Sequence, residues 1–121
     1  MNATSPVEQH VDRLNDAIGR GDFDGFLATF APEAVMRFEG VPGGPYVGRD
    51  AIAAAYAADP PDDTMRVVST REVAGGTLVR FRWDRGGGGF FVLGLQDGLV
   101  VRLDVSFLPE AESAWSGGWK L

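Results

Sequence analysis

The sequence predicts an α+β fold, in which helices from the first half of the chain pack against an antiparallel sheet from the second half. Helical periodicity is confined to residues 1–58, alternating apolar residues follow it, and glycine-rich turns separate the alternating segments. Because the helices precede the strands instead of alternating with them, a parallel α/β sheet is disfavoured. A length of 121 residues allows one hydrophobic core and is too short for two. We therefore expect a single domain over 1–121, with 1–5 and 110–121 as flexible termini.

The first predicted helix covers residues 7–18. Its apolar residues recur at spacings that place them on one helical face. These residues are Val7, Val11, Leu14 and Ile18. Pro6 is typical of a first helical turn, and Gly19 and Gly21 favour the end of the helix.

A second helix and a short strand are predicted to follow. Asp22 can cap this helix, and its apolar face extends to Phe30. Pro32 is expected to end it, because proline cannot donate a backbone hydrogen bond. Residues 34–39 are predicted to form the strand.

The third predicted helix covers residues 51–58, which are nearly all alanine. Asp50 is its predicted N-terminal cap. The preceding segment, residues 40–48, is rich in glycine and proline and is predicted to be a loop. Two prolines and three acidic residues in 59–63 end the helix.

A four-stranded antiparallel meander is predicted for the second half of the chain. Glycines at 75–76, 86–89 and 98 separate segments rich in β-branched and aromatic residues, which is typical of hairpins. The predicted strands are residues 66–73, 77–84, 90–96 and 99–107.

Alternation in two of these strands predicts one apolar and one charged sheet face. The expected apolar face carries Val79, Phe81, Trp83, Leu99, Val101, Leu103, Val105 and Phe107. The expected opposite face carries Arg80, Arg82, Asp84, Val100, Arg102, Asp104 and Ser106.

Composition excludes several functional classes. The chain has no cysteine, which rules out disulfides, thiolate metal sites and cysteine nucleophiles, and its one histidine, His10, rules out a multi-histidine metal cage. We expect no metal and no cofactor. A net charge of -6 disfavours general nucleic-acid binding. No apolar segment approaches the ~18–20 residues of a membrane span, and the N-terminus lacks a signal pattern. The cytoplasm is therefore the expected location.

Three short motifs resemble the nuclear transport factor 2-like superfamily, in its SnoaL-like and ketosteroid-isomerase-like branch. They are Gly21-Asp22-Phe23-Asp24-Gly25, Phe30-Ala31-Pro32-Glu33-Ala34 and Gly48-Arg49-Asp50-Ala51-Ile52. The resemblance covers roughly residues 7–107. It implies a cone-shaped, cystatin-like α+β barrel, in which three N-terminal helices pack in a strongly curved, mainly antiparallel sheet. The hollow of the cone opens at one end.

The resemblance also implies where a ligand and a partner would bind. The hollow would hold a small apolar molecule, and two copies of the chain would pair through the outer sheet face. The implied pocket residues are Leu14, Ile18, Phe30, Met36, Phe38, Tyr56, Phe81, Trp83, Phe91, Leu103 and Val105. Under the alternative interpretation, the aromatic residues among them fill the hollow as ordinary core.

Isomerase-like relatives use carboxyl groups whose pKa is raised by an apolar cavity. The resemblance places their helix-one tyrosine at Leu14, their base at Phe38 and their second acid near Phe91. All three positions are apolar here, which argues against that mechanism. Tyr56 matches a tyrosine that supports the oxyanion network in this branch.

Four polar residues are candidates for catalysis: Tyr56, His10, Glu39 and Asp104. His10 could act as a general base at the wide end of the hollow, or be a partly exposed residue bonded to a backbone carbonyl. Glu39 would face the hollow only after a one-residue register slip, and alternation favours the outside. Related cyclases carry an aspartate on the last strand, but alternation places Asp104 in a cross-strand ion pair outside.

Three functions follow as hypotheses. The first is a homodimeric domain whose apolar pocket binds a small hydrophobic molecule. The second is a cofactor-free isomerase, cyclase or dehydratase of secondary metabolism, which needs a polar group inside an open cavity. The third is a non-catalytic dimerisation or partner-binding domain, which predicts a filled hollow.

Overall fold

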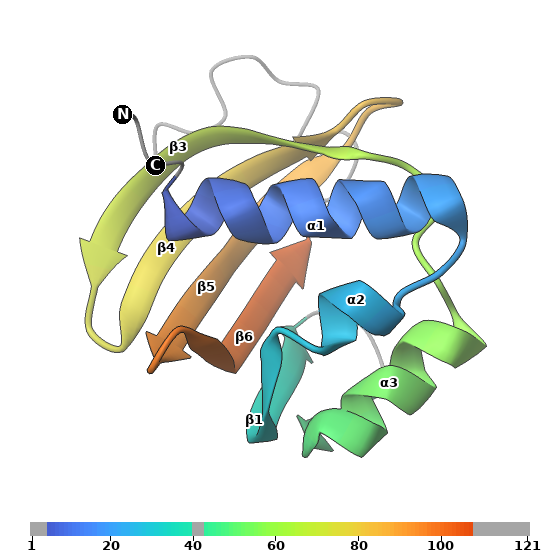
Figure 1. Ribbon diagram of the computed structural model, residues 1–121. Helices are drawn as coiled ribbons and strands as arrows, with labels where there is room; N and C mark the ends of the chain where they lie inside the picture. The colour runs from blue at the N-terminus through green and yellow to red at the C-terminus, as the bar shows by residue number, and fades with distance from the viewer. Residues whose placement is uncertain (1–4, 40–42, 108–121) are drawn as a thin grey trace.

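A computed structural model describes residues 5–39 and 43–107. Three helices pack against a six-stranded mixed sheet, so the predicted α+β fold class is confirmed (Figure 1). The helices are α1 (Pro6–Arg20), α2 (Asp24–Leu27) and α3 (Arg49–Ala58). The strands are β1 (Phe30–Glu39), β2 (Tyr46–Val47), β3 (Met65–Val73), β4 (Gly76–Trp83), β5 (Gly88–Gln96) and β6 (Leu99–Phe107). The predicted flexible termini lie outside the described residues, apart from Ser5.

The strand order is β2-β1-β6-β5-β4-β3. The meander predicted from β3 to β6 is present, and each of its neighbours pairs antiparallel. The seam between β1 and β6 is parallel and joins the two halves of the chain. Figure 1 shows the sheet curving around α1, with β3 arching over the helix. The concave face and α1 together enclose the core.

Helix α1 is longer than predicted because both of its ends are capped. The Ser5 hydroxyl accepts a hydrogen bond from the Glu8 amide at 3.1 Å, and Glu8 accepts one from the Ser5 amide at 3.4 Å. Gly19 does not end the helix. The end comes at Gly21, whose left-handed φ of 69° lets its amide reach the Ala17 carbonyl at 2.8 Å.

The predicted extension of the second helix to Phe30 is wrong. Helix α2 ends at Leu27, and Phe30 already pairs with Val100 of β6. Pro32 therefore lies inside β1 and does not end a helix. The β1–β6 register shifts between Phe30 and Val35, so the missing N–H of Pro32 falls in an irregular part of the ladder.

Two predictions between β1 and β3 also need correction. Residues 46–47, expected to be loop, form the edge strand β2 against β1. Asp50 does not cap α3, because the helix begins one residue earlier, at Arg49. Gly48 occupies the cap position with a φ of 94°, and no side chain caps this end. The Gly48 amide instead bonds to the Ala34 carbonyl at 2.7 Å, which ties α3 to β1.

Simple alternation fails at the start of β6. The β5–β6 register shifts so that Gly94 pairs with Arg102 and Leu95 with Val100, which leaves Val101 as the extra residue. Val100 is consequently buried in the core, whereas Leu99 and Val101 are half-buried. The predicted apolar face holds for Leu103 and Val105 but is wrong at these three positions.

Within residues 5–39 and 43–107, none of the helices combines the length and apolarity that a membrane crossing requires.

Candidate functional site

A cavity of about 530 Å³ is bounded by the concave sheet face, α1, α3 and the segment between α3 and β3. Most of its lining is apolar. Aliphatic and small residues lining it are Leu14, Met36, Ala55, Pro60, Pro61, Met65, Leu103 and Val105. Aromatic residues lining it are Phe38, Tyr56, Phe81, Trp83, Phe91 and Phe107. The remaining lining residues are His10, Asp59 and Asp62.

Two residues expected in this lining lie elsewhere. Phe30 is fully buried at the start of β1, where its ring packs against Phe26 at 5.3 Å and against His10 at 6.1 Å. The ring is therefore part of the packed core. Ile18 lies in the last turn of α1 and packs against that core without lining the cavity.

His10 is buried and surrounded by aromatic rings. It projects from α1, is 5% exposed, and lies 5.1 Å from the ring of Phe26 and 5.8 Å from that of Phe91. Its Nδ1 atom has no hydrogen-bond partner among the residues that the structure describes. Burial, with a smaller contribution from the positive charge of Arg13, lowers the pKa of His10 to about 4. The imidazole is thus neutral at pH 7, and neither the partly exposed environment nor the neutral-pH base considered from the sequence is found.

Tyr56 reaches the cavity from α3. Its ring stacks on Phe23 at 5.4 Å and meets the ring of Phe26 edge-on at 5.5 Å. Burial raises the pKa of the Tyr56 phenol above its ordinary value. The phenol therefore keeps its proton at neutral pH and offers an uncharged hydroxyl group.

Glu39 and Asp104 do not line the cavity. Glu39 is exposed, and its carboxylate accepts a 3.5 Å hydrogen bond from the Ser106 hydroxyl. Asp104 faces outward, where its Oδ2 atom binds the Nε atom of Arg102 at 2.7 Å. That ion pair joins two residues of one strand, whereas the expected pair crossed between strands. Of the four catalytic candidates, the structure brings only His10 and Tyr56 to the cavity.

The segment from Asp59 to Asp62 contributes a largely exposed rim to the cavity lining, whereas sequence reasoning treated it only as the end of a helix. Asp59 is exposed and the Asp62 side chain is 90% exposed, in contrast to the buried His10. The prolines between the two aspartates are the signal that could have identified this rigid rim. Ala55, Met65 and Phe107 also line the cavity but were not among the expected pocket residues. Ala55 and Phe107 lie within predicted elements, whereas Met65 directly precedes the strand predicted over 66–73.

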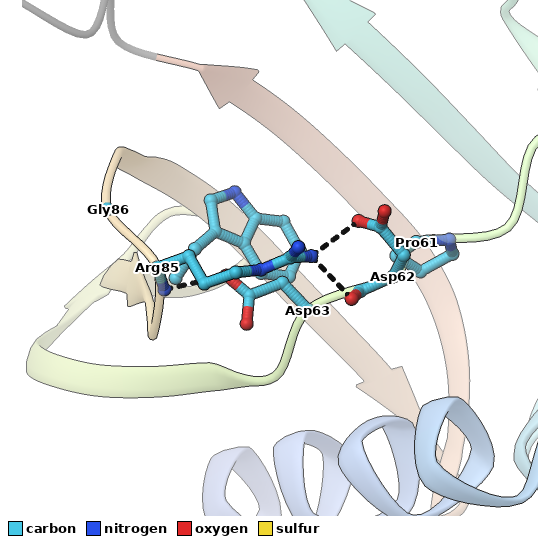
Figure 2. A pocket seen from close by; sticks show the side chains of 6 residues that line it. Pro61, Asp62, Asp63, Arg85 and Gly86 are labelled. Atoms are coloured by element: carbon cyan, nitrogen blue, oxygen red, sulfur yellow. Dashed lines mark hydrogen bonds and ion pairs between the residues drawn. The ribbon is translucent and has the colours of Figure 1, made fainter.

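Arg85 fastens this rim to the turn between β4 and β5. Figure 2 shows its guanidinium reaching both the side chain and the backbone carbonyl of Asp62, at 3.0 and 2.6 Å. The Arg85 amide also bonds to the Asp63 carboxylate at 2.8 Å. Only 16% of the Asp63 side chain is exposed, so this second attachment is better shielded from solvent. These residues and Trp83 border a smaller hollow of about 340 Å³ beside the cavity.

In the part of the chain that the structure describes, there is no group of three or more histidine, cysteine, aspartate or glutamate side chains that could hold a metal ion.

Comparison with known proteins gives one family match. A model of the SnoaL-like domain matches residues 11–107. A search of the curated proteins finds no matching sequence.

Many solved structures share the fold at low sequence identity. One is described as a putative polyketide cyclase from Sinorhizobium meliloti, with 22% identity, a TM-score of 0.61, and coverage of 84% of this chain and 99% of the other. A putative ketosteroid isomerase from Kribbella flavida has 18% identity, a TM-score of 0.64, and coverage of 86% and 78%. A protein of unknown function with a cystatin-like fold, from Methylobium petroleophilum, has 18% identity, a TM-score of 0.66, and coverage of 88% and 78%. At these identities the likeness shows the fold alone.

Proposed function

Because the chain belongs to the SnoaL-like domain family, we propose that it binds a small apolar molecule in the cavity between α1 and the sheet. The observation that carries this proposal is the lining, in which six aromatic side chains surround a space of about 530 Å³. Ligand pockets in proteins typically measure about 300–1,000 Å³ and are mainly apolar.

The aromatic lining favours a flat ligand. Phe81 and Phe91 come from neighbouring strands and pack at 5.8 Å, and Trp83 meets Phe81 edge-on at 5.4 Å. These rings brace one another, so their cavity-facing surfaces are held in place before a ligand arrives. A preformed apolar wall loses little side-chain entropy on binding. The same geometry argues against the filled hollow expected of a purely structural domain.

A cofactor-free enzyme, such as an isomerase, cyclase or dehydratase, is the second candidate. His10 and Tyr56 are titratable and line the cavity, and two structural neighbours are described as a putative polyketide cyclase and a putative ketosteroid isomerase. Burial, however, moves the pKa of each group away from neutrality, in the direction that favours its uncharged form. General acid–base catalysis is most effective with a pKa near the working pH. This contrast favours binding over proton transfer.

We further propose that two copies pair through the outer sheet face. On that face Leu78 pairs with Val92, which pairs with Asp104 on the next strand. Leu78, Phe90 and Val92 are half-buried apolar residues in the middle of the sheet. An apolar patch bordered by charged side chains suits association with a second copy.

Filling the cavity tests the binding proposal. Ala55 lines it, whereas Ala54, its neighbour on α3, is exposed. We expect Ala55→Phe to weaken binding of the uncharged dye N-phenyl-1-naphthylamine by at least about tenfold in a fluorescence titration, which corresponds to about 1.4 kcal/mol. The matched variant Ala54→Phe should bind the dye like the wild type. Equal affinity in both variants, or a wild type that leaves the dye unbound, would refute the proposed pocket.

A further inference from the structure

His10 is a buried polar side chain with one unpaired ring nitrogen in the part of the chain that the structure describes. Its Nδ1 atom neither accepts nor donates a hydrogen bond among residues 5–39 and 43–107. The ring's neighbours include Phe26, Phe30 and Phe91, whose rings offer no strong hydrogen-bonding atom. Leaving a buried polar atom unpaired costs free energy, because the atom loses its hydrogen bonds to water. A leucine or phenylalanine at this position would avoid that cost, so packing alone gives no reason for an imidazole.

His10 is part of the cavity wall, on the same helix as Leu14. We propose that His10 positions the bound molecule by forming a hydrogen bond with an uncharged hydroxyl group on it. This inference rests on the proposed function, because it concerns how the same cavity selects its ligand.

A hydroxyl group fits the chemistry of a neutral imidazole. One ring nitrogen of the neutral form is a donor and the other is an acceptor. A hydroxyl group can accept from the first or donate to the second, so it pairs with either tautomer. A carbonyl can only accept, and it therefore suits one tautomer alone.

The charge of the lining explains why the polar group should be uncharged. Among the described residues that line the cavity, the only charged side chains are Asp59 and Asp62, and both are acidic. Both are exposed, in contrast to the buried His10. They would repel an anionic ligand, which would meet no basic side chain among those residues. Arg85 reaches the rim, but its charge is engaged by Asp62 and Asp63.

Three probes that share one ring system test the proposal at pH 7.5 by isothermal titration calorimetry. They are naphthalene, 2-naphthol and 2-naphthoate. We expect the wild type to bind 2-naphthol roughly 2- to 12-fold more tightly than naphthalene, which corresponds to a net hydrogen bond of about 0.5–1.5 kcal/mol. The anion 2-naphthoate should bind more weakly than 2-naphthol.

Two variants of His10 and one of Tyr56 show which residue is responsible for the preference for 2-naphthol over naphthalene. His10→Leu should remove the preference for 2-naphthol over naphthalene, because the hydrogen bond to the hydroxyl group is lost. His10→Gln keeps a donor and an acceptor and should retain part of the preference. Tyr56→Phe should keep the preference, because the Tyr56 hydroxyl is not the group assigned to the ligand. Leu14→Met, on the same wall, should change both affinities by the same factor.

The outcomes separate this inference from the proposed function. If naphthalene binds but 2-naphthol gains nothing, or if His10→Leu keeps the preference, His10 is not the positioning residue and the apolar pocket stands. If Tyr56→Phe alone removes the preference, the role belongs to Tyr56. Tight binding of 2-naphthoate would overturn the selection against anions. If none of the probes binds the wild type, the pocket and this inference fail together.

Discussion

At the scale of single residues, burial decides what the polar groups of the cavity can do. His10 and Tyr56 share the aromatic neighbour Phe26, at 5.1 and 5.5 Å. Their surroundings lower the pKa of the imidazole and raise that of the phenol, so both favour the uncharged form. Glu39, by contrast, is exposed and does not line the cavity. The two titratable groups buried beside the cavity would therefore meet a ligand in their uncharged forms.

The buried imidazole should make stability depend on pH. The pKa of His10 is about 4 in the folded chain and 6.5 in the reference state, so between these values the unfolded chain binds a proton that the folded chain does not. Stability should consequently fall as the pH drops from 6.5 toward 4. Each pKa unit is worth about 1.4 kcal/mol, which sets the loss at roughly 2–3 kcal/mol between pH 7.5 and 4.5. Urea unfolding of the wild type and His10→Leu at both pH values measures it. Equal losses in the two proteins would show that His10 is not responsible.

Sequence reasoning identified many residues of the site but not how they are used. The apolar positions that line the cavity repeat with the period of their helix or strand, and this is why Leu14, Phe81 and Leu103 could be assigned in advance. Phe30 has the same chemistry, yet it fills the core because the chain enters β1 at that residue. The apolar environment of the His10 ring is formed by three aromatic rings from three separate elements. No pattern along the chain contains that information.

At the scale of elements, boundaries are set by backbone conformation as much as by periodicity. The four strands of the meander could be predicted because glycine turns separate segments rich in β-branched and aromatic residues, two of which alternate clearly. The start of β1 could not, because a proline normally disfavours a strand and is tolerated here only at a register shift. The bulge at Val101 could not be predicted either. Leu99, Val100 and Val101 are all apolar, so alternation does not show which of them faces the core. At the start of α3, by contrast, the positive φ of 94° at position 48 requires a glycine.

Two glycine substitutions with opposite expected signs test this account. Gly48→Ala forces a side chain into a φ of 94° and should destabilise the fold by about 1–2 kcal/mol. Gly19→Ala lies within α1, has open space around the added methyl group, and should stabilise it by up to about 0.5–1 kcal/mol. Thermal unfolding followed by circular dichroism compares them. A Gly48→Ala variant as stable as Gly19→Ala would contradict the assigned cap.

At the scale of the whole molecule, the family could be predicted from three short motifs, and the match over residues 11–107 confirms it. These motifs lie between α1 and α2, at the start of β1 and at the start of α3, so they carry the fold. They contain no residue that lines the cavity, which explains why they specify no ligand. The proposed association of two copies concerns a surface that alternation described as charged. The structure adds half-buried Leu78, Phe90 and Val92 to the same face.

That face gives a prediction about association. Lysine at position 92 would lie beside Asp104 on the neighbouring strand, which makes it tolerable within one chain but unfavourable against a second apolar patch. We expect the wild type to sediment as a dimer and Val92→Lys as a monomer that still binds N-phenyl-1-naphthylamine. The control Val47→Lys changes an exposed residue of the edge strand β2 and should remain dimeric. A monomeric wild type would rule out the proposed pairing.

The parallel seam between β1 and β6 also has a consequence for how the chain folds. Strands β3 to β6 are joined by tight turns, so their pairings are local and can form early. The pairing of Met36 with Leu103 must wait for the two halves of the chain to meet, at a larger loop-closure entropy. Both residues line the cavity. We therefore expect a hairpin array to assemble first and the binding chamber to be the last part of the molecule to close.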